Sequence, residues 1–264
     1  MTDALALDIA LRFPVLCDLD GVVWLSHQPI AGSVDAIARL RAAGHRVLFV
    51  TNNSAPLLAD HVRALEHLGI PARGDVLSSS MAAALLVEPG ERVMVCGGPG
   101  IAEAIANRGA VVADTAPYDA VLVGFHRNFD YEVMSRSSAA VRSGARLIAT
   151  NDDATYPTPD GLIPGGGAIL AGIATASGVM PEVAGKPYVP MARLVRAITG
   201  IDDLSSAVMI GDRPDPDGLF ATTLGCRYAH VWSGVTPAGA TVEPHPALEA
   251  ANLAAIADLL LSPA

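Results

Sequence analysis

Short apolar runs alternate with amphipathic stretches along this chain, and that alternation restricts its possible folds more than any other feature. Runs rich in Val, Leu and Ile, each of strand length, lie at 15–20, 46–52, 92–97, 120–125, 146–151, 207–212 and 226–232. Stretches with a helical period lie at 33–43, 57–68, 131–143, 188–199 and 246–260. This alternation predicts an α/β fold, with a mainly parallel sheet covered by helices on both faces.

The middle of the chain shows a strand–helix alternation of its own. It ends in an irregular stretch, 152–167, that is rich in Gly and Pro. The whole chain holds more strand–helix units than one compact sheet of this class needs. We therefore predict a core domain formed by 1–79 and 180–264, with a second α/β domain, 80–179, inserted between them.

The composition excludes several classes of protein. With 17 basic and 27 acidic residues the formal net charge is −10, which gives no support for nucleic-acid binding. Hydrophobic residues make up 51% of the chain, enough to form a large core and to exclude intrinsic disorder. No apolar run approaches the roughly 18 residues of a membrane-spanning helix, so no membrane partner is expected.

Two further features bear on the compartment. Residues 1–14 contain no basic segment of the kind that begins a secretion signal. The three cysteines are too few and too scattered for a disulfide framework or a zinc site. We therefore expect a cytoplasmic protein.

Asp18 and Asp20 end the first apolar run and are followed by Gly21. Because side chains alternate along a strand, both carboxylates point to the same side. Two such groups repel each other and lose hydration unless a divalent cation lies beside them, and Mg²⁺ prefers oxygen ligands of this kind. The alternative is a solvated turn, for which Asp-Gly is a common dipeptide.

Two more apolar runs end in polar residues that could complete a site. Ligands of open α/β sheets bind beyond the carboxyl ends of the strands, where we expect these residues to meet Asp18. Each group taken alone is also compatible with an ordinary turn or solvated loop. The residues in question are Thr51, Asn52, Asn53, Asp212 and Asp217.

Lys186 is the one lysine among 17 basic residues; the other 16 are arginines. Chance is one explanation. The other is a site that needs a compact ammonium group rather than a planar guanidinium. Lys186 opens the helical stretch before the run that ends at Asp212, so it can balance the carboxylates and bind a phosphate.

Four segments together resemble the motifs of the haloacid dehalogenase superfamily of phosphatases. They are Asp18-x-Asp20-Gly21, Thr51-Asn52-Asn53-Ser54, Gly185-Lys186-Pro187 and Gly211-Asp212-x₄-Asp217. The long insert before the third motif resembles the nitrophenylphosphatase-like (NagD-like) branch, which carries a large α/β cap. Segments 149–153 and 161–168 are similar to signatures of that cap. The resemblance implies a Rossmann-like core with an inserted cap domain.

The resemblance also implies a role for each motif residue. Asp18 matches the nucleophile that forms an aspartyl-phosphate, and Asp20 matches the general acid. The implied phosphate-binding residues are Thr51, Asn52 through its backbone, Asn53 and Lys186. The implied Mg²⁺ ligands are Asp18, the Asp20 carbonyl and Asp212, with Asp217 in the outer shell.

In the cap, the resemblance implies that Asp152, Tyr156 and His126 contact the substrate. His126 stands where family members often carry Asp. Pro214, Pro216 and Gly218 also depart from the family's fourth motif and predict an altered loop shape there. Similar proteins often dimerise through the cap, so a homodimer is a further expectation.

The function that this pattern favours is a Mg²⁺-dependent phosphomonoesterase. Its expected substrate is a small soluble ester: a sugar phosphate, glycerol phosphate, phosphoglycolate or a nucleoside monophosphate. The alternatives are a phosphotransferase, or a phosphate-binding sensor that has lost turnover. The presence of Asp20 argues against the sensor, because a sensor has no need of a general acid. Product analysis with alcohol acceptors distinguishes a phosphomonoesterase from a phosphotransferase.

Some residues invite other interpretations that we consider weaker. Gly97-Gly98-Pro99-Gly100 follows a strand but lacks the third glycine of a dinucleotide-binding loop. The histidines show no zinc spacing, which argues against a zinc site. We expect His61 and His67 to lie on a solvated helix face instead.

Overall fold

The structure is a computed structural model that describes residues 13–25, 27–158 and 160–262. The expectation about a secretion signal concerns mainly residues 1–12, which lie outside the described residues. None of the described helices combines the length and the apolar character that crossing a membrane requires.

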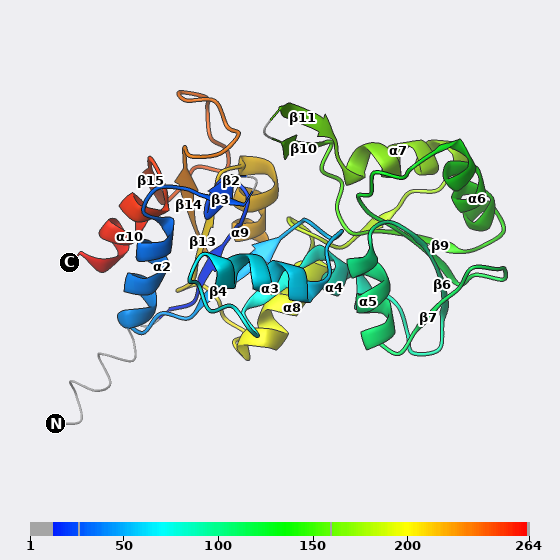
Figure 1. Ribbon diagram of the computed structural model, residues 1–264, viewed down its shortest axis with the longest axis horizontal. Coiled ribbons are helices and arrows are strands. Elements are labelled where there is room, and N and C mark those ends of the chain that lie inside the picture. Colours follow the sequence, from blue (N-terminus) through cyan, green and yellow to red (C-terminus); the bar gives the residue numbers. More distant parts are fainter. Residues whose placement is uncertain (1–12, 26, 159, 263–264) are drawn as a thin grey trace. The chain divides into compact units, whose positions relative to one another are not determined.

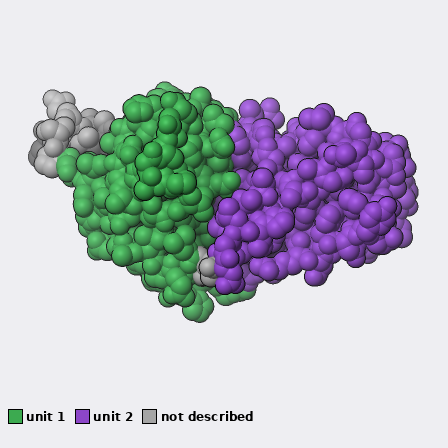
Figure 2. Space-filling view, turned by 90° about the horizontal axis from the view of Figure 1, so that it is seen from above, with its two compact units in different colours: residues 1–50, 62–76, 200–264 green, residues 51–61, 77–199 purple. Residues whose placement is uncertain are grey.

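The chain divides into two compact units, coloured separately in Figure 2. The first unit comprises Met1–Val50, Val62–Val76 and Gly200–Ala264, and the second comprises Thr51–His61 and Leu77–Thr199. The expected insert, 80–179, falls within the second unit. Its limits as a cap domain stay a prediction.

The first unit is built on a six-stranded sheet with the order β15-β14-β13-β1-β4-β5 (Figure 1). β1 pairs in parallel with β13 and with β4, and β14 pairs in parallel with β13 and with β15. All three residues of β1 are fully buried, which explains its continuous apolar sequence. The bounds are β1 Val15–Cys17, β4 Val47–Thr51, β5 Val76–Ser78, β13 Val208–Gly211, β14 Arg227–Val231 and β15 Leu248–Ala250.

Helices and a short hairpin complete this unit. α2 and α10 pack side by side in Figure 1, and Arg39 Nη1 lies 2.6 Å from Asp258 Oδ1 across that contact. The elements are α2 Ser33–Ala42, α9 Leu219–Leu224, α10 Leu253–Leu261, and the antiparallel pair β2 Trp24–Leu25 and β3 Gln28–Pro29. α3, Leu58–His67, has residues in both units.

The second unit contains a five-stranded parallel sheet with the order β12-β9-β8-β6-β7. Its strands are β6 Arg92–Cys96, β7 Val111–Val112, β8 Ala120–Val123, β9 Arg146–Ala149 and β12 Glu182–Val183. α6 and α7 pack against each other and share an apolar core with β6, β8 and β9. The helices are α4 Ser79–Ala84, α5 Pro99–Asn107, α6 Tyr131–Arg142, α7 Gly166–Ser177 and α8 Val189–Thr199.

Two expectations about local structure are wrong. The stretch 246–260 is not one helix: β15 pairs with β14, and α10 begins after Asn252, whose side chain accepts a hydrogen bond from Ala255 N. The stretch 152–167 is not irregular, because β10 Thr155–Thr158 and β11 Gly161–Pro164 form an antiparallel pair. Residues 214–218, where an altered loop shape was expected, form a single π-helical turn, and the N–H of Leu219 donates to Pro214 O.

Candidate active site

Two aspartates lie side by side where neighbouring strands of the first unit end. Asp18 follows β1 and Asp212 follows β13, and the register pairs Cys17 with Ile210. The amide of Asp18 donates to the carbonyl of Ile210 at 2.9 Å, which fixes the two strand ends together. The expected convergence at the carboxyl edge of the sheet is therefore present for this pair.

Asp217 joins this pair through the π-helical turn. Its Oδ2 accepts a hydrogen bond from Arg213 N at 3.1 Å, which directs the carboxylate back toward the strand end. One carboxylate oxygen from each of Asp18, Asp212 and Asp217 lies within 4.8 Å of the others. These three residues, here called the acidic cluster, are 8%, 1% and 0% exposed.

Glycines leave the space that the acidic cluster needs. Gly21 has φ +87°, and a Cβ there would come within 2.5 to 2.8 Å of the Asp212 carboxyl atoms. A Cβ at Gly211 or Gly234 would overlap the side chain of Asp217 or Asp212, respectively. Gly21 is thus required both for the sharp turn and for the close approach of backbone to carboxylate.

The electrostatics of the acidic cluster favour a cation. Burial raises the pKa of Tyr228, and the negative charges of Asp217, Asp212 and Asp18 raise it further. Buried carboxylates this close repel one another and lose hydration, costs that a bound cation offsets. Carboxylate oxygen is the donor type that hard divalent ions select, so the residues present fit such an ion.

Asp20 lies outside the three-carboxylate group that the described residues form. Its Oδ1 accepts a hydrogen bond from Trp24 Nε1 at 3.1 Å, which orients the side chain. Its assignment as an acid stays a prediction.

In the second unit, the side chain of Asn52 holds the backbone of Lys186 from both sides. Asn52 Oδ1 accepts from Lys186 N at 2.8 Å, and Nδ2 donates to Lys186 O at 3.0 Å. Nδ2 also donates to Asp153 Oδ2 at 3.1 Å. Lys186 is 2% exposed, and these two hydrogen bonds hold its backbone in place. The sequence indicated only the backbone of Asn52, and nothing in its pattern signals this amide–backbone pair.

Other buried polar groups fix Asn52 in turn. Its carbonyl accepts from Ser79 Oγ and from Asn151 Nδ2, each at 2.7 Å. The neighbouring Thr51 is 2% exposed, and its Oγ1 accepts from Asn53 N at 3.0 Å. Ser79 is the first residue of α4.

Two of the three expected substrate contacts in the cap have partners that the sequence did not indicate. Asp152 Oδ2 accepts from Tyr188 Oη at 2.5 Å. Burial, and then this hydrogen bond, raise the pKa of Tyr188 to about 12. Tyr156 stacks on Phe125 with ring centroids 5.2 Å apart, and its hydroxyl accepts from Asn53 Nδ2 at 3.3 Å.

His126, the third of these residues, has a different environment. Its Nε2 lies 3.7 Å from Cys96 Sγ, and its ring meets Phe129 edge to face. Burial lowers the pKa of His126, against the opposing charge of Asp130. Its described contacts are therefore with the end of β6 and with the segment that precedes α6, and its role in substrate binding stays a prediction.

Two of the weaker interpretations are also resolved. His61 is not on a solvated face: it is 3% exposed and its Nε2 lies 3.1 Å from the Asn53 carbonyl, while His67 is exposed as expected. The glycines at 98 and 100 permit close packing, because a Cβ at either would overlap Ala55 or Pro56.

The fold and the acidic cluster define an α/β protein with a candidate cation site beyond the ends of parallel strands. Two family models, described as haloacid dehalogenase-like hydrolases, match residues 15–111 and 183–256. An acid sugar phosphatase from Staphylococcus saprophyticus is 33% identical over 84% of this chain and 86% of its own length.

Two solved structures are similar over nearly the whole chain. The p-nitrophenyl phosphatase from Archaeoglobus fulgidus has a TM-score of 0.88 and 27% identity, covering 94% of this chain and 99% of that one. Glycerol phosphate phosphatase from Mycobacterium tuberculosis, in complex with magnesium, has a TM-score of 0.86 and 31% identity, covering 96% and 79%. The chain belongs to the haloacid dehalogenase-like hydrolases, in the NagD-like phosphatase branch.

The acidic cluster predicts stabilisation by a divalent cation. A cation at a concentration a hundredfold above its Kd stabilises the folded state by about 2.7 kcal/mol. For a chain of this size that corresponds to a rise in Tm of roughly 5–10 °C. Asp212→Asn should abolish the rise, because it removes a charged ligand while keeping an acceptor for Val235 N. Thermal unfolding of chelator-treated protein, titrated with MgCl₂, measures the effect.

Asp215→Asn is the matched control, because Asp215 is exposed on the same π-helical turn. It should keep the full rise in Tm. An equal response of both variants to the cation would show that the acidic cluster does not bind it.

The contact between Asn52 and Lys186 predicts a second effect. Asn52→Leu leaves the buried N–H and C=O of Lys186 without their side-chain partners, which should lower the free energy of unfolding by about 2–4 kcal/mol. Hydrogen exchange of the Lys186 amide should accelerate by about 10-fold or more, since 1.4 kcal/mol is tenfold in an equilibrium constant.

Asn53→Leu is the control for size and polarity, because Asn53 is only half-buried and bonds to Tyr156 rather than to Lys186. It should leave exchange at Lys186 unchanged. The same protection at Lys186 in both variants would contradict the positioning role of Asn52.

Proposed function

We propose that this phosphatase is a Mg²⁺-dependent phosphomonoesterase that hydrolyses a small organic phosphate through an aspartyl-phosphate on Asp18. The acidic cluster is the observation that carries the proposal, since it places three buried carboxylates at the strand ends of a phosphatase fold. The acid sugar, glycerol phosphate and nitrophenyl phosphatases among the relatives support a small ester as substrate. Sugar phosphates, glycerol phosphate, phosphoglycolate and nucleoside monophosphates are the candidates.

Two aspartates carry the proposed chemistry. Asp18 attacks the phosphorus atom, and the bond between phosphorus and the ester oxygen breaks. Asp20, oriented by Trp24 Nε1, gives its proton to the leaving oxygen and then takes a proton from the water that hydrolyses the aspartyl-phosphate. The products are an alcohol, inorganic phosphate and the free Asp18 carboxylate.

Asp18, Asp212 and the Asp20 carbonyl would hold the Mg²⁺ ion, with Asp217 behind them. When bound, the ion supplies positive charge that neutralises the phosphoryl oxygens. The hydrogen bond from Arg213 N keeps the Asp217 carboxylate oriented toward this group.

Lys186, Thr51, Asn52 and Asn53 are the proposed phosphate-binding residues. Phosphoryl transfer depends mainly on positioning and charge neutralisation, and Lys186 supplies a compact positive charge. Asn52 fixes the Lys186 backbone, so the side chain that carries the ammonium group extends from a fixed point. Asp152, Tyr156 and His126 are proposed to influence which ester is accepted.

Phosphate release from a panel of esters tests the proposal. Glycerol 3-phosphate, a hexose phosphate, phosphoglycolate, a nucleoside monophosphate and nitrophenyl phosphate should be compared with Mg²⁺ and with excess chelator. We expect turnover of at least one small ester, its loss in chelator and its recovery with Mg²⁺. Full activity in chelator would contradict the assignment of the acidic cluster, and transfer to added alcohols would identify a phosphotransferase.

The two aspartate roles predict different kinetics. Asp18→Asn should abolish both the phosphoenzyme and turnover. Asp20→Asn should slow esters with poor leaving groups by about 10²–10⁴-fold, while nitrophenyl phosphate, which needs little protonation, loses much less. The measurement is kcat/KM of both variants on an alkyl and a nitrophenyl ester. An equal loss on both esters would leave Asp20 without an acid role.

A further inference from the structure

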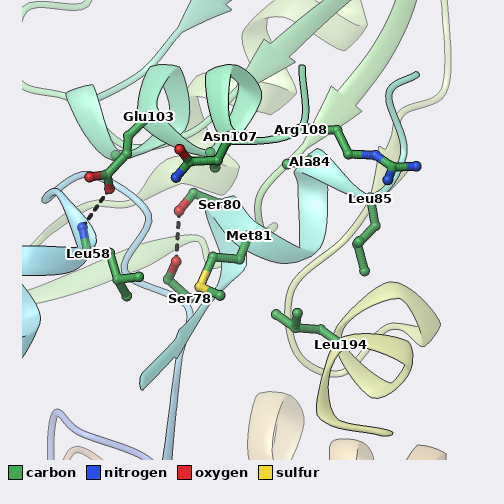
Figure 3. A pocket seen from close by; sticks show the side chains of 12 residues that line it. Leu58, Ser78, Ser80, Met81, Ala84, Leu85, Glu103, Asn107, Arg108 and Leu194 are labelled. Carbon is green, nitrogen blue, oxygen red and sulfur yellow. Dashed lines mark hydrogen bonds between the residues drawn. The ribbon is translucent and has the colours of Figure 1, made fainter. Parts of the chain in front are cut away.

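A pocket of about 200 Å³ in the second unit lies apart from every residue discussed so far as a catalytic or phosphate-binding group. It is formed by α4, α5 and the start of α3, with Leu194 of α8 (Figure 3). Its lining comprises Leu58, Ser78, Ser80, Met81, Ala84, Leu85, Gly100, Glu103, Ala104, Asn107, Arg108 and Leu194.

Most of the pocket wall is apolar and matches the body of a small molecule. Met81 and Leu85 of α4, Ala104 of α5 and Leu194 contribute aliphatic surface. A cavity of about 150 Å³ with such a lining is large enough to bind benzene. The pocket therefore suits one ring or a branched aliphatic group and is too small for a nucleotide.

The polar groups of the pocket come mainly from one face of α5. Glu103 Oε2 accepts from Leu58 N at 2.8 Å, as Figure 3 shows, and the carboxylate can accept further hydrogen bonds. Arg108 is already engaged: its Nε donates to Val87 O at 3.1 Å and its Nη2 lies 3.7 Å from Glu88 Oε2. Arg108 keeps its positive charge but lies at the opposite end of the pocket from Glu103 (Figure 3). The end that Glu103 lines therefore offers a ligand a negative charge, which favours a donor such as a primary ammonium.

The pocket wall also connects to the phosphate-binding residues through the second unit. Ser78 and Ser80 line the pocket and bond to each other at 2.8 Å (Figure 3). The residue between them, Ser79, donates to the Asn52 carbonyl at 2.7 Å. An occupant that contacts Ser78 or Ser80 is therefore next to the residue whose side chain bonds to the Asn52 carbonyl.

We infer that this pocket binds a small amine with a compact apolar body, and that the bound amine alters phosphate binding through Ser79 and Asn52. The first part of this inference, binding of the amine (the binding half), depends only on the pocket. The regulatory half rests on the proposed function.

Ligand-observed NMR on the full chain tests the binding half, with benzylamine as the probe and benzoate as a probe of the same size and opposite charge. We expect saturable binding of benzylamine in the low-millimolar range, as for a molecule with few contact atoms, and much weaker binding of benzoate. No saturable binding of benzylamine, or equal binding of the two probes, overturns the proposal.

Two variants locate the site. Glu103→Gln keeps an acceptor for Leu58 N but removes the charge, and should weaken benzylamine about 10-fold. Glu132→Gln removes the same charge from an exposed position on α6 and should leave binding unchanged. Ala104→Leu fills part of the pocket and should abolish binding in a protein that still melts cooperatively. Binding that is unchanged in Glu103→Gln overturns the assignment, whether or not Ala104→Leu folds.

Phosphate-release kinetics test the regulatory half. Saturating benzylamine should change KM for the best ester by about 5-fold or more, the lower end of ordinary coupling between sites, and should do so less in Ala104→Leu. An unchanged KM in wild-type protein overturns the regulatory half. Absence of phosphate release from every ester would refute the proposed function, whereas the NMR titration gives its result independently of turnover.

Discussion

Repulsion among three buried carboxylates is the constraint on which the first unit depends. Two unit charges about 4 Å apart interact with roughly 4 kcal/mol at an effective dielectric constant of 20. Asp18, Asp212 and Asp217 meet this repulsion at the ends of a buried sheet, where all three side chains are shielded from water. The π-helical turn carries Asp217 into this cluster, and Gly21 lets the backbone approach the Asp212 carboxylate closely.

In the second unit, the corresponding constraint is that the buried Lys186 must be held at a fixed position. A long aliphatic side chain has several rotamers, so its ammonium group is placed only as well as its backbone is fixed. Asn52 supplies that fixation with one amide group, and Ser79 and Asn151 fix Asn52 through its carbonyl. Ser79 stands in the sequence between Ser78 and Ser80, which line the pocket beside α5, and this is the route by which we propose that a bound ligand acts on Asn52 and Lys186.

Asp152, Tyr156 and His126 were all expected to contact the substrate, but the structure gives them different neighbours. Asp152 and Tyr156 each bond to a residue in or beside a phosphate-binding motif, Tyr188 and Asn53 respectively. His126 instead contacts Cys96 and Phe129, in the apolar part of the unit. If all three residues influence substrate choice as proposed, the first two are better placed than His126 to couple that choice to the proposed phosphate-binding residues.

The sequence by itself determined the central buried strands and the residues that end them. A buried parallel strand must be apolar throughout, so the runs that became β1, β4 and β13 are visible without a structure, as are Asp18, Thr51 and Asp212 at their ends. Only the tertiary structure decided the contacts between distant segments. Asn52 and Lys186 are 134 residues apart, and no local pattern records that one side chain will meet the other backbone. His61 likewise has the spacing of an exposed position but is buried, because burial depends on what packs against a helix and not on the helix alone.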